Sequence, residues 1–187
     1  MTLLTRVYGR AAEQHGFLTP ADVREAGGSP MALVMLARRG TVEHVDRGLY
    51  RIPELAGGPF AREQEALLRL PGGVLSHDTA LAVADLADVN PQRVHVTMPH
   101  GYQLRKRIPA WIVLHRAHLE PGEIDAVAGL AVTTPARSIL DALAGHTGRR
   151  FTEQAFVTAR ERKLLTAPEE RRVRRALAGR GAEGQAR

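Results

Sequence analysis

The chain has 187 residues, of which 44% are hydrophobic and 25% charged. This balance is typical of a globular protein with a buried core, and the length allows one ordinary domain or two small ones. The absence of cysteine excludes disulfides, thiolate zinc sites and cysteine nucleophiles. No apolar run approaches the length of a membrane span and no signal peptide is evident, so we expect a cytoplasmic protein without membrane contact.

The positive charge is concentrated at one end of the chain. The formal net charge is +6, which favours polyanionic partners. Residues 1–55 carry seven Arg against six acidic residues, and residues 56–148 carry eight basic against nine acidic residues. Residues 149–187 carry eleven basic against five acidic residues and therefore account for the excess.

Three helices are expected in the first forty residues. Residues 3–16 show the apolar spacing of an amphipathic helix. Two further helices begin at a capping residue followed by proline, at Thr19-Pro20 and at Ser29-Pro30, with Gly27-Gly28 between them. Two helices joined by a tight glycine-containing turn form a helix-turn-helix.

A β-hairpin is expected to follow these helices. Residues 41–52 contain two short β-prone runs around Asp46-Arg47-Gly48, where Gly48 can supply the positive φ of a tight turn. Tyr50 is expected to pack on the domain core. The Pro- and Gly-rich segment 53–59 resembles a linker. Residues 1–55 are therefore predicted to form a winged helix-turn-helix DNA-binding domain.

The third helix is the usual reader of base edges in such domains. Leu33 and Leu36 should face the core, and the outer face is poor in groups that read bases. The alternative is a helix that is buried on both faces or that binds a protein. The expected DNA contacts on this helix and the wing are Ser29, Met31, Ala32, Met35, Arg38, Arg39, His44, Arg47 and Arg51.

Residues 60–187 are predicted to form a mixed α/β domain with a small sheet, which makes the whole chain α+β. The predicted strands are 74–75, 94–98, 111–115 and 130–133. The predicted helices are 60–70, 79–86, 136–144 and 152–165, with a last Arg-rich helix after a capping box at Thr166–Glu169. Arg137 and Asp141 are spaced as an i,i+4 ion pair.

Basic residues of this second domain are candidates for contact with nucleic acid or with a protein partner, because counterion release rewards such clusters. The alternative is that they form ordinary solvated surfaces. The candidates in a loop and in the basic helical end, residues 149–187, are Arg105, Lys106, Arg107, Arg160, Lys163, Arg171, Arg172 and Arg175.

No catalytic or metal site is expected. Ser76, His77 and Asp78 are adjacent and cannot form a triad, which requires side chains that converge in space. Asp78 is interpreted as a helix cap and His77 as a structural residue. His115 and His118 lack a third ligand in the sequence pattern. We therefore predict no metal, no cofactor and no enzymatic activity.

Several motifs resemble AbiEi-type antitoxins. In the first domain these are Thr19-Pro20-Ala-Asp22, Gly28-Ser29-Pro30 and Val45-Asp-Arg-Gly-Leu-Tyr-Arg-Ile-Pro53. In the second they are Leu75-Ser-His77, Val94-His-Val-Thr97-Met-Pro99 and Val132-Thr-Thr-Pro135-Ala-Arg137. The resemblance spans about residues 5–145.

The resemblance implies a type IV toxin–antitoxin system, sometimes part of phage defence by abortive infection. The antitoxin would bind repeats in its own promoter as a repressor and counteract a nucleotidyltransferase toxin encoded beside it. Neutralisation could be indirect, by direct complex or by modification of the toxin with a kinase-like activity. A stand-alone winged-helix regulator is the alternative outside toxin control.

Overall fold

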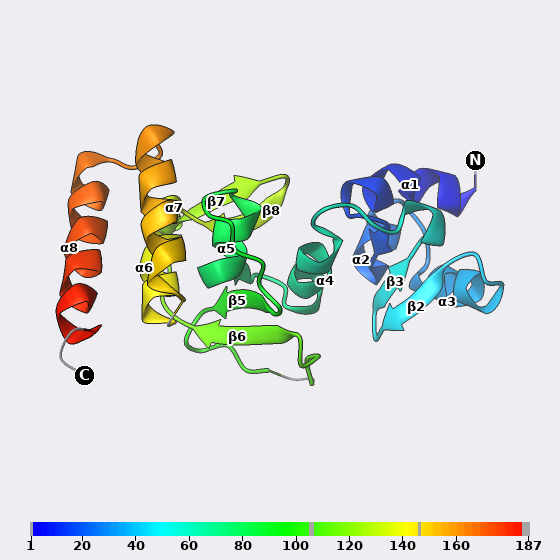
Figure 1. Ribbon diagram of the computed structural model, residues 1–187. Helices are drawn as coiled ribbons and strands as arrows, with labels where there is room; N and C mark the ends of the chain where they lie inside the picture. The colour runs from blue at the N-terminus through cyan, green and yellow to red at the C-terminus, as the bar shows by residue number, and fades with distance from the viewer. Residues whose placement is uncertain (1, 105–106, 146, 185–187) are drawn as a thin grey trace. The chain divides into compact units, whose positions relative to one another are not determined.

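A computed structural model describes residues 2–104, 107–145 and 147–184, with side chains as far as Gly179. The chain forms two compact units, Met1–Arg69 and Leu70–Arg187, shown as a ribbon in Figure 1. Both helices and strands occur in each unit, so the predicted α+β class is confirmed.

The first unit has the order of elements of a winged helix-turn-helix. Three helices and a short first strand precede a hairpin, and a three-stranded antiparallel sheet forms in the order β1-β3-β2. The elements are α1 (Leu3–Glu13), β1 (Phe17–Leu18), α2 (Pro20–Glu25), α3 (Pro30–Arg38), β2 (Glu43–Asp46), β3 (Leu49–Arg51), η1 (Pro53–Leu55) and α4 (Ala61–Arg69). In this arrangement α2 and α3 form the helix-turn-helix and β2–β3 form the wing.

Local capping explains where the two central helices begin. Thr19 and Asp22 form a reciprocal capping box, and the Ser29 hydroxyl accepts a 3.3 Å hydrogen bond from the amide of Met31. The turn between the helices needs glycine, because a Cβ at Gly28 would lie 2.5 Å from Leu3 Cδ1 and 2.9 Å from Val23 Cγ1. The close approach of α1 to this turn therefore depends on Gly28.

The core of the first unit joins α1 to the sheet. Its members are apolar residues that are at most 8% exposed: Val7, Ala11, Leu18, Val23, Leu33, Val42, Tyr50 and Ile52. Tyr50 thus packs in the core, as predicted. Burial of this cluster fixes α3 and the wing in one body, because non-polar burial is the main favourable term in folding.

The second unit places helices against a mixed five-stranded sheet of order β6-β5-β4-β8-β7. Its elements are β4 (Val74–Leu75), α5 (His77–Val83), β5 (Val94–Met98), β6 (Ile112–Arg116), η2 (Pro121–Glu123), β7 (Ile124–Val127), β8 (Leu130–Thr133), α6 (Pro135–Ala144), α7 (Arg149–Glu161) and α8 (Ala167–Gly184). Apolar side chains of α5 to α8 form one core cluster around Leu81, Ile139 and Phe156. None of the helices in the described ranges combines the length and the apolar character needed to cross a bilayer.

Two predicted ion and capping interactions of the second unit are present. The Arg137 guanidinium donates to Asp141 at 2.8 Å and also reaches Glu123 at 2.6 Å. The capping box at Thr166 and Glu169 starts α8, with the Thr166 amide donating to the Glu169 carboxylate at 2.7 Å. The contact between Arg137 and Glu123 ties α6 to η2, and the capping box fixes the start of the basic last helix.

Other local predictions for the second unit are wrong. Helix α5 begins at His77, and the Asp78 carboxylate accepts a hydrogen bond from the Thr147 hydroxyl instead of capping the helix. Helix α7 begins at Arg149, so Thr152 lies inside its first turn, buried, and donates to the Arg149 carbonyl at 2.9 Å. Strand β7 was missed because its residues are mostly exposed and lack the alternation of a half-buried strand.

Helix α4 belongs to the first compact unit. The sequence placed the chain from residue 60 onward in the second domain, beyond a linker at residues 53–59. This linker contacts the turn after α1, since His15 Nδ1 lies 3.2 Å from the Gly57 carbonyl oxygen. The functional boundary after residue 55 stays a prediction.

Candidate nucleic-acid interface

Helix α3 presents one buried and one exposed face. Leu33 is fully buried, whereas Met31 and Met35 are 63% and 41% exposed. Ser29 and Arg38 are exposed at the two ends of the helix. The predicted reading face is therefore open to solvent, and the alternative of a helix buried on both faces does not fit.

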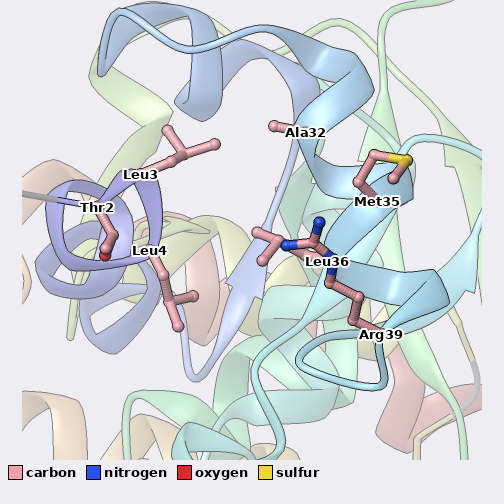
Figure 2. A pocket seen from close by; sticks show the side chains of 7 residues that line it. All are labelled: Thr2, Leu3, Leu4, Ala32, Met35, Leu36 and Arg39. Atoms are coloured by element: carbon pink, nitrogen blue, oxygen red, sulfur yellow. The ribbon is translucent and has the colours of Figure 1, made fainter.

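An apolar cleft lies beside this face, between α1 and α3 (Figure 2). Its volume is about 430 Å³, and it is lined by residues at the start of α1 and along most of α3. The lining residues are Thr2, Leu3, Leu4, Ala32, Met35, Leu36 and Arg39. Ala32 and Arg39 thus line this cleft and lie at the edge of the predicted DNA-reading face of α3.

The wing is a very short hairpin with Arg47 at its tip. Strands β2 and β3 are joined by Arg47 and Gly48, and Gly48 has φ +73°, as the turn requires. The Arg47 side chain is exposed. His44 is also exposed and packs edge-on against Tyr50, with ring centroids 5.1 Å apart.

Arg51, by contrast, is held within the wing. Its guanidinium donates to the Glu43 carboxylate on the neighbouring strand at 2.6 and 3.0 Å. This pair neutralises the charge locally and fixes the side chain across the two strands. Arg51 is therefore a weaker candidate for a phosphate contact than Arg47.

Three exposed cations at the end of α3 and in the wing turn are available to a polyanion. The ion pairs found in the described part of the chain do not use the side chains of Arg38, Arg39 or Arg47. Arg38 and Arg39 lie at the carboxyl end of α3, where positive charge also complements the helix dipole. Helix α3 and the wing tip thus both offer unpaired positive charge to the same kind of ligand.

Arg69 was not anticipated from the sequence. Its guanidinium contacts Asp46, the last residue of β2 beside the wing turn, and donates to Glu65 at 2.8 Å, and its side chain is only 8% exposed. A buried arginine between two carboxylates links α4 to the wing. Sequence separation hides this link, because Asp46 precedes Arg69 by 23 residues.

The basic candidates of the second unit divide into paired and exposed residues. Arg160 donates to Glu170 at 2.9 Å and lies over the Phe156 ring at 5.6 Å. Arg172 lies 3.9 Å from Glu123. The exposed candidates are Arg107, Lys163, Arg171 and Arg175, whereas Arg105 and Lys106 lie outside the described residues.

The histidines that the sequence singled out separate in the fold. His118 is exposed and lies 2.9 Å from a Glu120 carboxylate oxygen. His115 instead meets His95 and His77, two residues from other elements. The sequence pattern paired His115 with His118, which is not its neighbour in the fold. Strand register, rather than spacing along the chain, decides which side chains meet.

The match with a known family falls on the winged unit. Residues 10–53 match the family described as transcriptional regulator, AbiEi antitoxin. The N-terminal segment is AbiEi-like. The AbiEi match begins within α1 and ends just after the wing, so it contains α2, α3 and both wing strands. The resemblance noted in the sequence is confirmed for this segment.

A solved structure shows a weak similarity over nearly the whole chain. A crystal structure of the RV2827C protein from Mycobacterium tuberculosis superposes with a TM-score of 0.47 at 18% identity, over 95% of this chain and 81% of that one. That similarity is too low to transfer a function. No curated protein is detectably related in sequence. The AbiEi assignment therefore rests on residues 10–53.

Proposed function

We propose that this chain is a cytoplasmic type IV antitoxin that binds repeats in its own promoter as a repressor and counteracts a nucleotidyltransferase toxin. The observation that carries the DNA-binding part is the exposed face of α3 beside a wing with an unpaired arginine, inside the AbiEi-like segment. A winged helix inserts such a helix into the major groove and places its wing on the adjacent backbone.

The proposed contacts follow from the side chains offered. Arg38 and Arg47 bind phosphate or guanine, since a guanidinium is suited to both. Met31 and Met35 contact thymine methyl groups, because these are the apolar features of the groove. The scarcity of amide side chains on this face favours recognition by shape and methyl contact over a dense hydrogen-bond code.

The second unit is proposed to supply toxin control and part of the DNA affinity. The first 55 residues carry seven basic against six acidic residues, so their long-range attraction for DNA is weak. Exposed arginines of α8, Arg171 and Arg175, offer additional charge on the side of the helix opposite the buried Val173. These residues add salt-dependent affinity without sequence information.

A protein-binding role for α3 is the second candidate. The apolar cleft between α1 and α3 and the exposed methionines favour it, because methionine adapts to varied apolar partners. In that case the toxin, rather than DNA, would contact this face. The two roles differ in their response to salt, since only phosphate binding releases many counterions.

Footprinting of the full chain on its own upstream DNA at two salt concentrations tests the proposal. We expect protection at repeated half-sites that weakens at the higher salt. Arg38→Ala and Arg47→Ala should each lower the affinity about tenfold. Arg116→Ala, which removes one exposed arginine from β6 in the second unit, is the matched control and should change the affinity little.

Two results would overturn the DNA-binding proposal. One is the absence of any salt-dependent protection of the upstream DNA. The other is equal loss of affinity in Arg47→Ala and in the Arg116→Ala control. Binding of purified toxin that is lost in Met35→Glu, with promoter binding absent throughout, would establish the second candidate instead.

A further inference from the structure

Three imidazole rings meet in the second unit, although they come from three separate elements. His77 is the first residue of α5, His95 lies in β5 and His115 lies in β6. One ring nitrogen of each lies within 4.8 Å of those of the other two. His115 Nε2 is 3.1 Å from His95 Nδ1, and the His77 and His115 rings stack with centroids 3.7 Å apart.

The sheet register explains the meeting of two of these rings. In the parallel pair β5–β6, His95 lies opposite Val113 and Thr97 lies opposite His115. His95 and His115 are therefore offset by two residues along the sheet and project from the same face. Such diagonal neighbours are within reach of each other when the side chains are long.

His77 reaches the same place because the chain turns sharply after β4. The Ser76 amide donates to the His95 carbonyl at 3.0 Å, and the Ser76 hydroxyl accepts from Thr97 at 2.7 Å. His77 Nδ1 lies 2.9 Å from that same hydroxyl. Buried hydrogen bonds thus hold one nitrogen of His77 and leave Nε2 for another partner, as is typical of histidines that bind metals.

The backbone at His77 is strained, and the ring has little room behind it. His77 adopts φ +54°, a left-handed conformation that costs a side-chain-bearing residue about 1 kcal/mol or more. A Cβ at Gly145 would lie 2.9 Å from His77 Cδ2. Unfavourable backbone conformations persist where the surrounding structure enforces them and are concentrated at functional sites.

Burial favours the neutral form of all three rings. Burial, with the neighbouring His115, His95 and Arg137, lowers the pKa of His77 to about 3. Burial and His95 lower the pKa of His115 to about 4, and burial lowers that of His95. Neutral imidazoles carry the lone pairs that bind metals. The nearby Asp78 carboxylate opposes these shifts, so its negative potential extends over His95 and His115 and would favour a cation.

We propose that His77, His95 and His115 bind one divalent first-row transition-metal ion, with zinc as the expected occupant. Imidazole nitrogen suits zinc, whereas calcium and magnesium require oxygen ligands. Three protein nitrogens leave the fourth tetrahedral position to water or to an exchangeable group. His95 and His115 are each partly exposed, so an ion can enter from solvent.

Ion binding would connect α5 to the edge strand of the sheet. Tetrahedral zinc with Zn–N distances of about 2.0–2.1 Å requires nitrogens that are closer together than the present spread. The rings must therefore rotate from their stacked arrangement when the ion binds. The bound ion would cross-link two strands and a helix start, and so raise the unfolding temperature of the second unit.

The test uses the full chain without an affinity tag, stripped of metal by a chelator. Zinc chloride is titrated in a calorimeter, and cobalt(II) chloride is followed by visible absorption, which distinguishes four-coordinate from six-coordinate Co²⁺. We expect one ion per chain, intense four-coordinate absorption and a rise of several degrees in unfolding temperature. X-ray absorption of the zinc complex should show nitrogen or oxygen neighbours at about 2.0–2.1 Å.

Variants locate the bound ion. His95→Gln and His115→Gln should lower zinc affinity at least tenfold, and so should His77→Asn, which tolerates the left-handed backbone. His118→Gln is the matched control and should bind zinc as the unchanged chain does. Circular dichroism of each metal-free variant separates loss of binding from loss of folding.

The proposal is overturned if the unchanged chain binds neither ion stoichiometrically. It is equally overturned if folded His95→Gln and His115→Gln retain full affinity, or if His118→Gln loses it. Because the three histidines lie in the second unit, these outcomes are independent of whether the winged unit binds DNA.

Discussion

The Arg69 guanidinium at the end of α4 contacts the carboxylate of Asp46, the last residue of β2 beside the wing turn. The same arginine forms an ion pair with Glu65, one helical turn earlier in α4, so one buried cation pairs with two carboxylates. The wing therefore depends on a helix that lies outside the AbiEi-like segment, which ends at residue 53. Removal of this cation would leave two partly buried carboxylates without a positive charge beside them.

Arg69→Met should loosen the wing while α1 keeps its stability. We expect a loss of about 1–3 kcal/mol in the local opening free energy of β2 and β3, because the partner carboxylates are left unpaired. Native-state hydrogen exchange of amides in the wing and in α1 measures the difference. Arg116→Met is the control, and equal loss of protection in α1 and the wing would contradict the local role.

Arg47 and Arg51 should differ in their effect on DNA binding. Arg47→Ala removes an exposed, unpaired cation and should reduce the slope of log affinity against log salt by about 1. Arg51→Ala removes a cation already paired with Glu43 at 2.6 Å and should change the slope little. Fluorescence anisotropy across a salt series compares the two, and equal slopes would refute the distinction.

Acid should weaken the first unit through Asp22. Burial opposes ionisation, but hydrogen bonds from the Thr19 side chain and backbone and from Arg10 outweigh it and lower the pKa of Asp22 below its usual 3.8. The folded-state pKa is below the unfolded value, so this stabilisation is fully present above pH 3.8 and is lost as the pH falls through the folded pKa. Asp22→Asn should be less stable at pH 7 and show a flatter acid limb in denaturant titrations. An unchanged acid limb would contradict this role.

Gly145→Ala should impair the proposed metal site without replacing any of its three ligands. The added methyl group would meet His77 Cδ2 at 2.9 Å, so the ring must move away from His95 and His115. Zinc affinity should fall at least several-fold in calorimetry. Gly122→Ala, where a Cβ meets nothing within 4 Å, is the control, and unchanged zinc binding in Gly145→Ala would argue against a rigid His77.

Exposed and paired arginines of the basic helical end should differ in their effect on DNA binding. The double variant Arg171→Ala, Arg175→Ala should reduce the salt slope of non-specific DNA binding by about 2 if both contact phosphate. Arg160→Ala breaks contacts with Glu170 and Phe156 and should mainly alter the packing of α7 against α8. Anisotropy with unrelated duplex DNA provides the measurement, and an unchanged slope in the double variant would remove α8 from the DNA-binding proposal.

Local chemistry made the winged unit predictable. Thr19 and Ser29 each precede a proline, and Gly48 supplies the positive φ of the wing turn, so the elements can be located from neighbouring residues alone. Strand β7 lacked such a signal: its turn to β8 uses Ala128 at φ +50° where asparagine or glycine is usual. Its exposed residues gave no alternation.

The long-range contacts were not predictable from spacing. Arg69 meets Asp46, and His77 meets His95 and His115, only after the strands have paired and the chain has turned. The predicted DNA contacts on α3 and at Arg47 are exposed as a reading face requires, and their role stays a prediction. In the described second unit, Arg160 forms an ion pair with Glu170, although the sequence had predicted it as a contact for nucleic acid or a protein partner.

The two residues of the wing turn have different roles. Gly48 carries the strained backbone angle, and Arg47 carries the only side chain at the tip of the two-residue turn. Substitutions at position 47 should therefore keep the hairpin, whereas most substitutions at position 48 would strain it, because its φ is +73°. If Arg47 contacts the operator as proposed, a directed-evolution library at this single codon would explore new binding sequences on an intact scaffold.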